Sequence, residues 1–379
     1  MKFNLLLSFC LFISSVLKAQ QLDVDIRKLT IEEGFGYAVS AMEMLPDNNT
    51  IAIGTAQGPL YIWDLAGEKL IKRIEVSGYR LSGPRITVSK DGKLLLLEQQ
   101  YYNDFNLNTD KTGQVEVLDI ESGKVLLKVN DVHDAELSPD NKYLLTLSAS
   151  KVNIYNIQSG KHERSIVVED ATNAVSISPD GQTIVVAHKL RKEDLQHIPS
   201  VRGDKKAQKS ALKYRQTISL FSFIDGTKQK TINELFDIVY SIRFSKDGSK
   251  FFVYNVANTK LQAQAGGSSG NRQGYINQVD VSSAQVLRTM FSSMAPEPDY
   301  KENPENTLLG VSSADIDRKL VPSLLLYETE LGSIVKKYEM NVRLLQEKSI
   351  ISPIYFVFYP SGDKVLFSYG SKLGVWNIK

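Results

Sequence analysis

The stretch at residues 175–187, V-S-I-S-P-D-G-Q-T-I-V-V-A, recurs in altered form along the chain and limits its fold more than any other feature. Val175 and Ile177 alternate with polar residues, as in a half-buried strand, whereas residues 184–187 form an unbroken apolar run that suits a strand covered on both faces. Between them Ser-Pro-Asp-Gly favours a tight turn, because Pro presets φ, Asp bonds its own backbone and Gly accepts a positive φ. The stretch therefore predicts a β-hairpin.

Similar turns recur along the chain, and together with the first they make seven. They lie at residues 45–48, 89–92, 138–141, 178–181 and 245–248, with weaker copies at 303–306 and 359–362. Each is followed by an apolar strand and then a third strand, and after most third strands come a Ser-Gly-Lys type of turn and a more polar fourth strand. Four antiparallel strands in a period of roughly fifty residues predict an all-β fold, a seven-bladed β-propeller.

The two ends of the sequence predict how the ring closes. The sequence stops at Lys379, directly after a third strand, so the last blade needs a fourth strand from elsewhere. Residues 24–31 precede the first hairpin and resemble the fourth strand at residues 70–76. We expect residues 24–31 to pair with residues 375–378, which would leave no exposed closing edge. A six-bladed ring is the alternative, because the sixth repeat is the least regular and is rich in proline.

Residues 1–19 have the composition of a secretory signal peptide. Lys2 is followed by an apolar run that is too short to span a bilayer and that ends near the small residue Ala19. Cys10 would suggest a lipoprotein, but lipidation needs a small residue before the cysteine and Phe9 is large. We therefore expect an exported protein, periplasmic or extracellular, in which residues 20–379 form a single propeller domain.

Export would change the cysteine content and the charge of the chain. Cys10 is the only cysteine, so the mature chain would hold neither a disulfide nor a thiolate metal site. Loss of Lys2 and Lys18 would lower the formal charge from +2 to about 0. A nucleic-acid partner is therefore not expected. No second long apolar segment follows, which predicts a soluble domain without a transmembrane segment.

The repeats resemble a known family. The Ser-Pro-Asp-Gly turns, Trp63-Asp64 and the near match Trp376-Asn377 are similar to the WD40 and WD40-like propeller repeats, and the resemblance covers nearly all of residues 20–379. No blade has the Gly-His dipeptide of the eukaryotic repeat, and only one true Trp-Asp occurs, so the divergent bacterial WD40-like class fits better. The resemblance implies a binding scaffold more often than an enzyme, although a fold alone does not settle function.

The largest break in the repeat is a basic insertion at residues 188–217, between the second and third strands of the fourth blade. It is either a solvated loop or a docking surface for an acidic protein, a lipid headgroup or a polysaccharide, because clustered cations focus a local potential. Its candidate binding residues are Lys189, Arg191, Lys192, Arg202, Lys205, Lys206, Lys209, Lys213 and Arg215.

Two further insertions occupy the same point of the repeat and therefore the same rim of the disc. Residues 99–113 carry Tyr101, Tyr102 and Phe105, which would stack on sugars or at an interface, or else form a small local cluster under the loop. Residues 258–274 are rich in Gly and Ser but lack the context of a phosphate-binding loop. A local function is expected on this rim, since loops carry most binding residues.

Signals for catalysis are few. The sequence contains no nucleophile elbow, Walker loop or Cys-His pair, and its four histidines do not form a metal-ligand pattern, so neither a metal nor a cofactor is expected. The starts of the inner strands would place Arg85, His133, Glu136 and Arg243 in the central funnel, a mixed set that suits a polar lining better than a metal cage.

Two hypotheses remain at this point. The first is an exported, non-catalytic and monomeric interaction module that binds a protein of the cell envelope, through the insertion-bearing rim or the central funnel. The second is a propeller enzyme of the lactonase or quinoprotein type, in which side chains from several blades converge on the axis. The family resemblance favours the first hypothesis.

Overall fold

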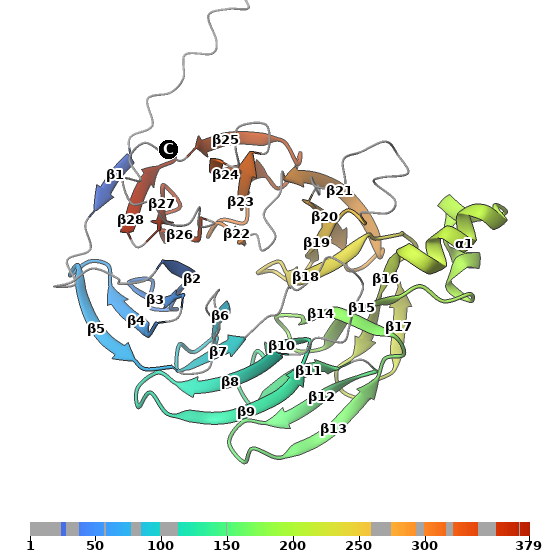
Figure 1. The fold of residues 1–379 in the computed structure, drawn as a ribbon, viewed down its shortest axis with the longest axis horizontal. Helices are drawn as coiled ribbons and strands as arrows, with labels where there is room; N and C mark the ends of the chain where they lie inside the picture. The colour runs from blue at the N-terminus through green and yellow to red at the C-terminus, as the bar shows by residue number, and fades with distance from the viewer. Residues whose placement is uncertain are drawn as a thin grey trace, which may run out of the picture.

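The structure is a computed structural model that describes residues 24–27, 38–56, 58–76, 85–98, 113–148, 150–258, 274–292, 299–315, 321–339, 354–370 and 372–379. Seven four-stranded antiparallel sheets are arranged around a central axis (Figure 1). The fold is a seven-bladed β-propeller, as predicted, and the irregular sixth repeat forms a complete blade. The six-bladed alternative is therefore wrong.

The first four blades follow the chain in order, each with its innermost strand first. Their strands are β2 (Val39–Met44), β3 (Thr50–Thr55), β4 (Leu60–Asp64) and β5 (Lys69–Ile74); β6 (Arg85–Val88), β7 (Leu94–Glu98), β8 (Gly113–Asp119) and β9 (Val125–Val132); β10 (Asp134–Leu137), β11 (Tyr143–Ser148), β12 (Lys151–Asn156) and β13 (His162–Val167); and β14 (Ala171–Ile177), β15 (Thr183–Lys189), β16 (Gln216–Ser222) and β17 (Lys228–Thr231).

The last three blades complete the ring. Their strands are β18 (Ile238–Phe244), β19 (Lys250–Val256), β20 (Gly274–Asp280) and β21 (Gln285–Ser292); β22 (Tyr300–Glu302), β23 (Leu308–Asp315), β24 (Val321–Glu328) and β25 (Ile334–Glu339); and β26 (Phe356–Phe358), β27 (Lys364–Tyr369) and β28 (Lys372–Asn377) with β1 (Val24–Arg27). Within the described residues, no helix is both long and apolar enough to cross a membrane.

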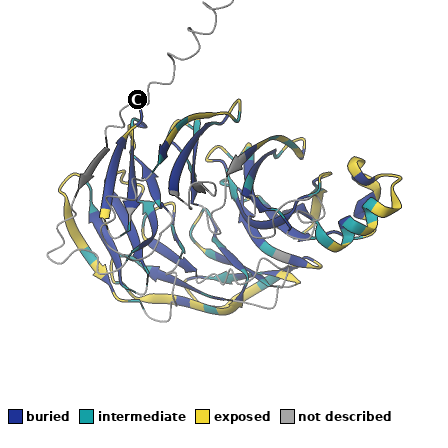
Figure 2. Cartoon of the chain, turned by 45° about the horizontal axis from the view of Figure 1, so that its top comes forward, coloured by how far each residue is buried: buried dark blue, intermediate teal, exposed yellow. Residues whose placement is uncertain are grey.

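The hydrophobic core lies between the blades. In β15, Ile184 and Val186 pack in a cluster shared with the third blade, whereas Val185 and Ala187 pack in a cluster shared with the fifth. All four side chains are fully buried, which confirms that the unbroken apolar run is a strand covered on both faces. The outermost strands are largely exposed, in keeping with their polar sequences (Figure 2).

The recurrent turn forms through its own side chains. The Ser178 hydroxyl donates to the Asp180 carboxylate and accepts the Thr183 N–H, while the Gly181 N–H bonds the Ser178 carbonyl. Gly181 has a φ of 72°, the left-handed conformation that glycine adopts without strain. The repeated Ser-Pro-Asp-Gly sequence is therefore a requirement of the turn, as expected.

The ring closes through the two ends of the described chain. Strand β1 pairs with β28 in antiparallel register, with Val24 opposite Trp376 and Arg27 opposite Leu373. This confirms the predicted closure for residues 24–27, while residues 28–31 of the predicted strand lie outside the described residues. The seventh sheet thus has four strands, with β1 at its outer edge.

The disc has two rims because consecutive connections in an antiparallel blade alternate between its ends. We call the rim formed by the seven turns between first and second strands the turn rim. The connections from second to third strands, and from each fourth strand to the next blade, form the insertion rim. The basic insertion belongs to the insertion rim, as predicted, and the strands that flank the other two insertions, β7 with β8 and β19 with β20, have the same order in their blades.

Candidate functional site

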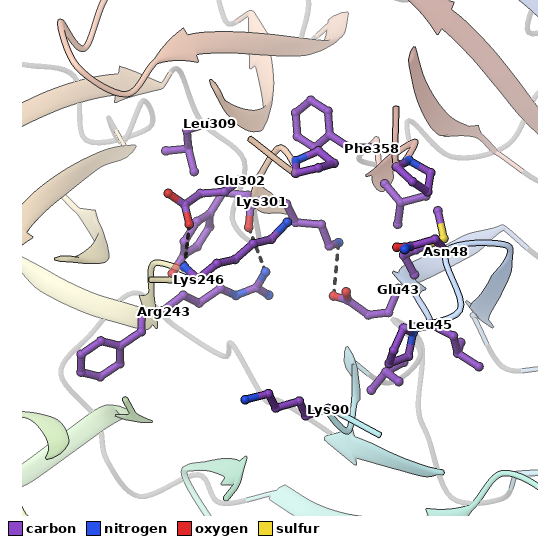
Figure 3. Close-up of a pocket in the computed structure, with 18 of the residues that line it drawn as sticks. Glu43, Leu45, Asn48, Lys90, Arg243, Lys246, Lys301, Glu302, Leu309 and Phe358 are labelled. Carbon is purple, nitrogen blue, oxygen red and sulfur yellow. Dashed lines mark hydrogen bonds and ion pairs between the residues drawn. The ribbon is translucent and has the colours of Figure 1, made fainter. Parts of the chain in front are cut away.

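A cavity runs along the axis of the ring and reaches the turn rim (Figure 3). It has two lobes, of about 680 and 560 Å³. The lobes share a wall that includes Glu43, Lys90, Arg243 and Lys246. Because each wall segment is the end of an innermost strand, every blade contributes to this one space.

The second residue of each turn forms a ring at the mouth of the cavity. In five blades this residue is proline, which suits the second position of a tight turn; these prolines are Pro46, Pro139, Pro179, Pro304 and Pro360. In the second and fifth blades it is instead a lysine, Lys90 and Lys246. The Lys246 backbone N–H bonds Glu302 at 3.1 Å, and its ammonium lies 3.3 Å from the Asn303 carbonyl oxygen. Burial lowers the pKa of Lys246.

Arg243 lies below the mouth, near the end of β18. Its guanidinium sits over the Tyr300 ring, 4.8 Å from the ring centre, and Nη1 donates to the Tyr300 carbonyl oxygen at 2.9 Å. The same nitrogen is 3.8 Å from Asp299 Oδ1. Burial lowers the pKa of Arg243, but the surrounding groups, Tyr300 and Asp299 foremost, raise it overall. The side chain therefore stays charged and is held from one side, with 30% of its surface exposed to the cavity.

Lys301 of the sixth blade reaches past the seventh blade to the first. Its ammonium lies 2.6 Å from Asp299, 2.9 Å from the Met42 carbonyl oxygen and 3.3 Å from Glu43 (Figure 3). Burial raises the pKa of Glu43, and the charges of Lys301 and Arg243 oppose that rise. Lys301 therefore spans the cavity wall and neutralises two carboxylates.

Arg85 connects the second, third and fourth blades through carboxylates. Its Nη2 lies 2.6 Å from Glu98 and 2.7 Å from Asp134, and Asp134 in turn accepts the Val175 backbone N–H at 2.7 Å. Burial raises the pKa of Asp134, and the charge of Arg85 opposes that rise. We interpret this group as a structural clamp, because each of its charges is matched within the fold.

Glu136 projects from β10 into the second lobe. Its carboxylate accepts the Ser176 hydroxyl at 3.2 Å. Burial raises the pKa of Glu136 to about 7, with a further rise from the charge of Glu98 and opposing contributions from Arg85 and Arg243. This carboxyl group therefore changes charge near neutral pH.

Three of the four predicted funnel residues, Arg85, Glu136 and Arg243, line the cavity. His133 precedes β10 on the side of the insertion rim and is not among the residues of either lobe. Lys90, Lys246 and Lys301 were missed. The replacement of proline by lysine in two turns was the available signal for Lys90 and Lys246. Among the described residues, no three His, Cys, Asp or Glu side chains are grouped as a metal site would require.

The basic insertion is folded. It begins after β15 and forms the 3-10 helices η1 (Asp194–His197) and η2 (Pro199–Val201) and the helix α1 (Lys205–Tyr214), which projects outward from the fourth blade (Figure 1). Asp204 caps α1 by accepting the N–H groups of Lys206 at 2.8 Å and Ala207 at 2.9 Å. The insertion also has its own apolar cluster, formed by Leu190, Leu195, Ile198, Val201 and Ala211. The insertion is therefore a folded element and not an irregular loop, and whether its exposed face is only solvated or docks a partner stays a prediction.

The nine predicted basic residues fall into three groups. Arg191 pairs with Glu169, Glu193 and Asp194, and Arg215 pairs with Asp237 at 2.5 Å, so both hold the insertion in place. Lys189 is the last residue of β15. The remaining six are exposed: Lys192, Arg202, Lys205, Lys206, Lys209 and Lys213.

His188 was grouped with the insertion in the sequence, but it lies within β15 and is buried. Its Nε2 is 2.8 Å from the Ser219 hydroxyl, and burial lowers its pKa. His197 is exposed on η1. His188 is thus a structural residue of the fourth blade.

Several predictions fall on residues that lie outside the described ones. These are the signal peptide at residues 1–19, the Gly- and Ser-rich residues 259–273, and the aromatic candidates Tyr101, Tyr102 and Phe105. They stay predictions.

No protein-family model matches the chain, and no curated protein matches it significantly. The resemblance to WD40-like repeats therefore depends on the turn sequences, and the seven-bladed arrangement is consistent with it.

Proposed function

We propose that this protein is an exported, non-catalytic scaffold of the divergent WD40-like class, and that it docks an acidic segment of a protein partner on helix α1. The observation that carries the proposal is the folded basic insertion, which presents an ordered row of lysines away from the ring. The part of the proposal that concerns export is supported only by the sequence of residues 1–19.

The lysines of α1 form a stripe on one face. Lys205, Lys209 and Lys213 are spaced four residues apart, so their side chains lie above one another along the helix. Like charges at this spacing repel, and Lys205 and Lys206 also oppose the helix dipole in the first turn, which contains no acidic residue. The helix thus has a charge distribution that weakens it in isolation. An acidic partner would relieve both costs.

The distribution of apolar residues on α1 favours a protein partner over a membrane. Ala207 and Ala211 lie opposite the lysine stripe, and together with Leu212 they pack in the cluster of the insertion. The exposed face therefore consists of polar and basic side chains, without the apolar residues that a helix needs to enter the lipid interface. A folded helix suits an acidic protein segment, because it fixes the spacing of the lysines along its backbone before binding.

The test is binding of a fluorescent Glu- and Asp-rich peptide of about twenty residues, measured by anisotropy at low and at physiological salt. The wild-type protein is compared with the variant K205Q/K206Q/K209Q/K213Q. We expect the wild type to bind, with affinity falling as salt rises, and the variant to lose about tenfold or more. The control variant K69Q/K124Q/K161Q/K372Q removes four exposed lysines from elsewhere on the ring and should bind like the wild type.

Three outcomes oppose the proposal. Equal loss in both variants would mean that overall charge, and not α1, attracts the peptide. Equal binding by the wild type and the α1 variant would assign the peptide to another surface. Tighter binding to anionic phospholipid vesicles or to an acidic polysaccharide than to the peptide would replace the protein partner with one of those polymers.

The enzyme of lactonase or quinoprotein type stays the alternative. The mixed charges of the axial cavity are the feature that favours it. Most of the carboxylates described there are already bound to Arg85 or Lys301, so an enzyme of this type would have to use Glu136 or Glu302. Turnover of lactone substrates by the wild type, and its loss in Glu136→Gln, would establish the alternative.

A further inference from the structure

We propose that the axial cavity binds a small organic molecule with two acidic groups, held by Lys90 and Lys246 at the mouth and by Arg243 below it. This site lies at the turn rim and is independent of the docking surface on α1. The inference depends on the ring of turn residues, the free side of Arg243 and the balance of charge in the wall.

The turn itself does not require a lysine at its second position, where Lys90 and Lys246 lie. The Gly92 N–H bonds the Ser89 carbonyl at 2.9 Å, so residues 89–92 form the same turn as the proline-containing copies. Proline at the second position would stabilise the turn by restricting the unfolded chain, and five blades have it. The two lysines therefore replace a residue that would serve the turn better. Both project their charge at the mouth.

The two lysines come from widely separated parts of the ring. Two blades lie between the second and the fifth on one side and three on the other, which is the largest separation that seven blades allow. In Figure 3 Lys90 lies across the opening from Arg243 and Lys246. Lys90 is exposed, and among the described residues no carboxylate pairs with it. A ligand in the opening would thus have cations on opposing sides.

Arg243 provides a directed contact in the depth of the cavity. Its Nη1 is bound to the Tyr300 carbonyl oxygen, whereas Nε and Nη2 donate no hydrogen bond to another described residue. The Tyr300 ring and carbonyl fix the plane of the guanidinium, so its free edge is already oriented. Such an edge binds a carboxylate or a phosphate through two parallel hydrogen bonds.

The wall of the cavity has an excess of positive charge. It contains five cationic and three acidic side chains: Arg85, Lys90, Arg243, Lys246 and Lys301 against Glu43, Glu136 and Glu302. Burial raises the pKa of each of these acids, which reduces their negative charge near neutral pH. Arg85 and Lys301 are paired with Glu98, Asp134, Asp299 and Glu43, so the cations of the wall that remain to attract an anion are Lys90, Lys246 and Arg243.

The size of the cavity limits the ligand. Each lobe measures several hundred cubic ångströms, within the range of sites that enclose metabolites. Apolar side chains, among them Val88 and Phe244, separate the charged groups of the shared wall. A molecule with two acidic groups joined by a carbon skeleton would match this arrangement. Dicarboxylates and sugar phosphates share that chemistry.

The test is isothermal titration of the purified protein with the dicarboxylate succinate and with fructose 1,6-bisphosphate at low salt, and glucose serves as the neutral control. We expect at least one of the two anions to bind with a Kd below about 1 mM, and glucose not to bind. The anion that binds more tightly distinguishes a carboxylate from a phosphate ligand. Failure of both anions to bind at about 10 mM would overturn the proposal.

Two variants locate the site without disturbing the fold. Lys90→Pro recreates the Ser-Pro-Asp-Gly turn of the other blades, and Lys246→Gln keeps the backbone N–H that bonds Glu302. Each variant should raise the Kd for the anion by about tenfold, because a charge-assisted contact is lost. Arg243→Gln should weaken it more, and its thermal unfolding should be recorded beside the binding.

The matched control is K124Q/K161Q, which removes two exposed lysines from the outer turns. Anion binding that falls equally in this control and in the mouth variants would show general charge attraction and overturn the site. The α1 variant K205Q/K206Q/K209Q/K213Q should bind the anion like the wild type. The two proposals are therefore tested separately: loss of peptide binding to α1 says nothing about anion binding in the axial cavity, and the reverse also holds.

Discussion

Lys301 and Glu43 lie 3.3 Å apart, although they belong to the sixth and the first blade. The same ammonium contacts the Met42 carbonyl oxygen and Asp299, so one side chain joins two blades that are not neighbours. The seventh blade between them is the one that the two ends of the chain complete. Lys301 thus reinforces the ring where its covalent continuity is interrupted.

Lys301→Met should destabilise the protein by about 3 kcal/mol, because the half-buried Glu43 would lose its cation and the buried Asp299 would keep only Arg243, 3.8 Å away. The measurement is urea unfolding followed by tryptophan fluorescence. Lys337→Met removes a lysine paired at the surface with Glu339 and should change the free energy of unfolding by less than about 1 kcal/mol. Equal effects in both variants would refute a special role for Lys301.

Glu136 should make stability depend on pH. Burial raises its pKa to about 7, above its ordinary value of 4.5, so the folded state binds the proton more tightly than the unfolded state does. Its contribution to stability is therefore complete below pH 4.5 and is lost as the pH rises through 7.

The variant Glu136→Gln isolates this contribution. We expect the wild type to lose about 2 kcal/mol relative to the variant between pH 5 and pH 8, a figure reduced for the solvent that reaches the cavity. Urea unfolding of both proteins at the two pH values measures the difference. Parallel pH profiles would show that Glu136 titrates as it does in the unfolded chain.

The fold of the insertion can be disrupted without disrupting the ring. Ile198 is 1% exposed within the small apolar cluster of the insertion, so Ile198→Ala should open that cluster. Trypsin should then cut residues 190–215 about tenfold faster or more, while thermal unfolding of the ring changes little. Val167→Ala, at a residue that is 71% exposed, should leave the cleavage rate unchanged. Rapid cleavage of the wild type would contradict a folded insertion.

Strand β1 should be required for a monomeric ring. A protein that begins at residue 28 would expose the edge of β28, whose backbone groups pair with β1 in the structure. We expect a lower unfolding temperature, by roughly 10 °C, and concentration-dependent association measured by light scattering. A protein that begins at residue 20 should behave as a monomer. If the protein without residues 20–27 kept the same unfolding temperature and stayed monomeric, β1 would contribute no stability.

The fold was predictable because each requirement is local. The Ser178 and Asp180 turn, the alternation of Val175 and Ile177, and the apolar run of β15 each specify a strand or turn without reference to distant residues. Repetition then indicated seven blades, and the structure excluded the six-bladed alternative that the irregular sixth repeat had left open. The pairing of residues 24–27 was the one distant contact that the pattern indicated, since the last repeat lacked a strand.

The candidate site was less predictable because it depends on convergence. Arg243 and Lys90 are far apart in sequence, and only the closed ring brings them to one cavity. Lys301 was missed because the sixth turn is irregular and its inner strand was not recognised. The folding of residues 190–215 was missed for a different reason: their few apolar residues are spread among many charges, and the sequence gives no regular spacing that indicates the cluster they form.

The pairing of Val24 with Trp376 also has a consequence for how the protein is made. Strand β1 is made long before its partner β28, so the seventh sheet cannot be completed until β28 has been synthesised. During that interval the apolar faces of blade one and of each newly made blade have no second neighbour. We expect the closing of the ring to be slow, because it pairs strands that are about 350 residues apart in the sequence.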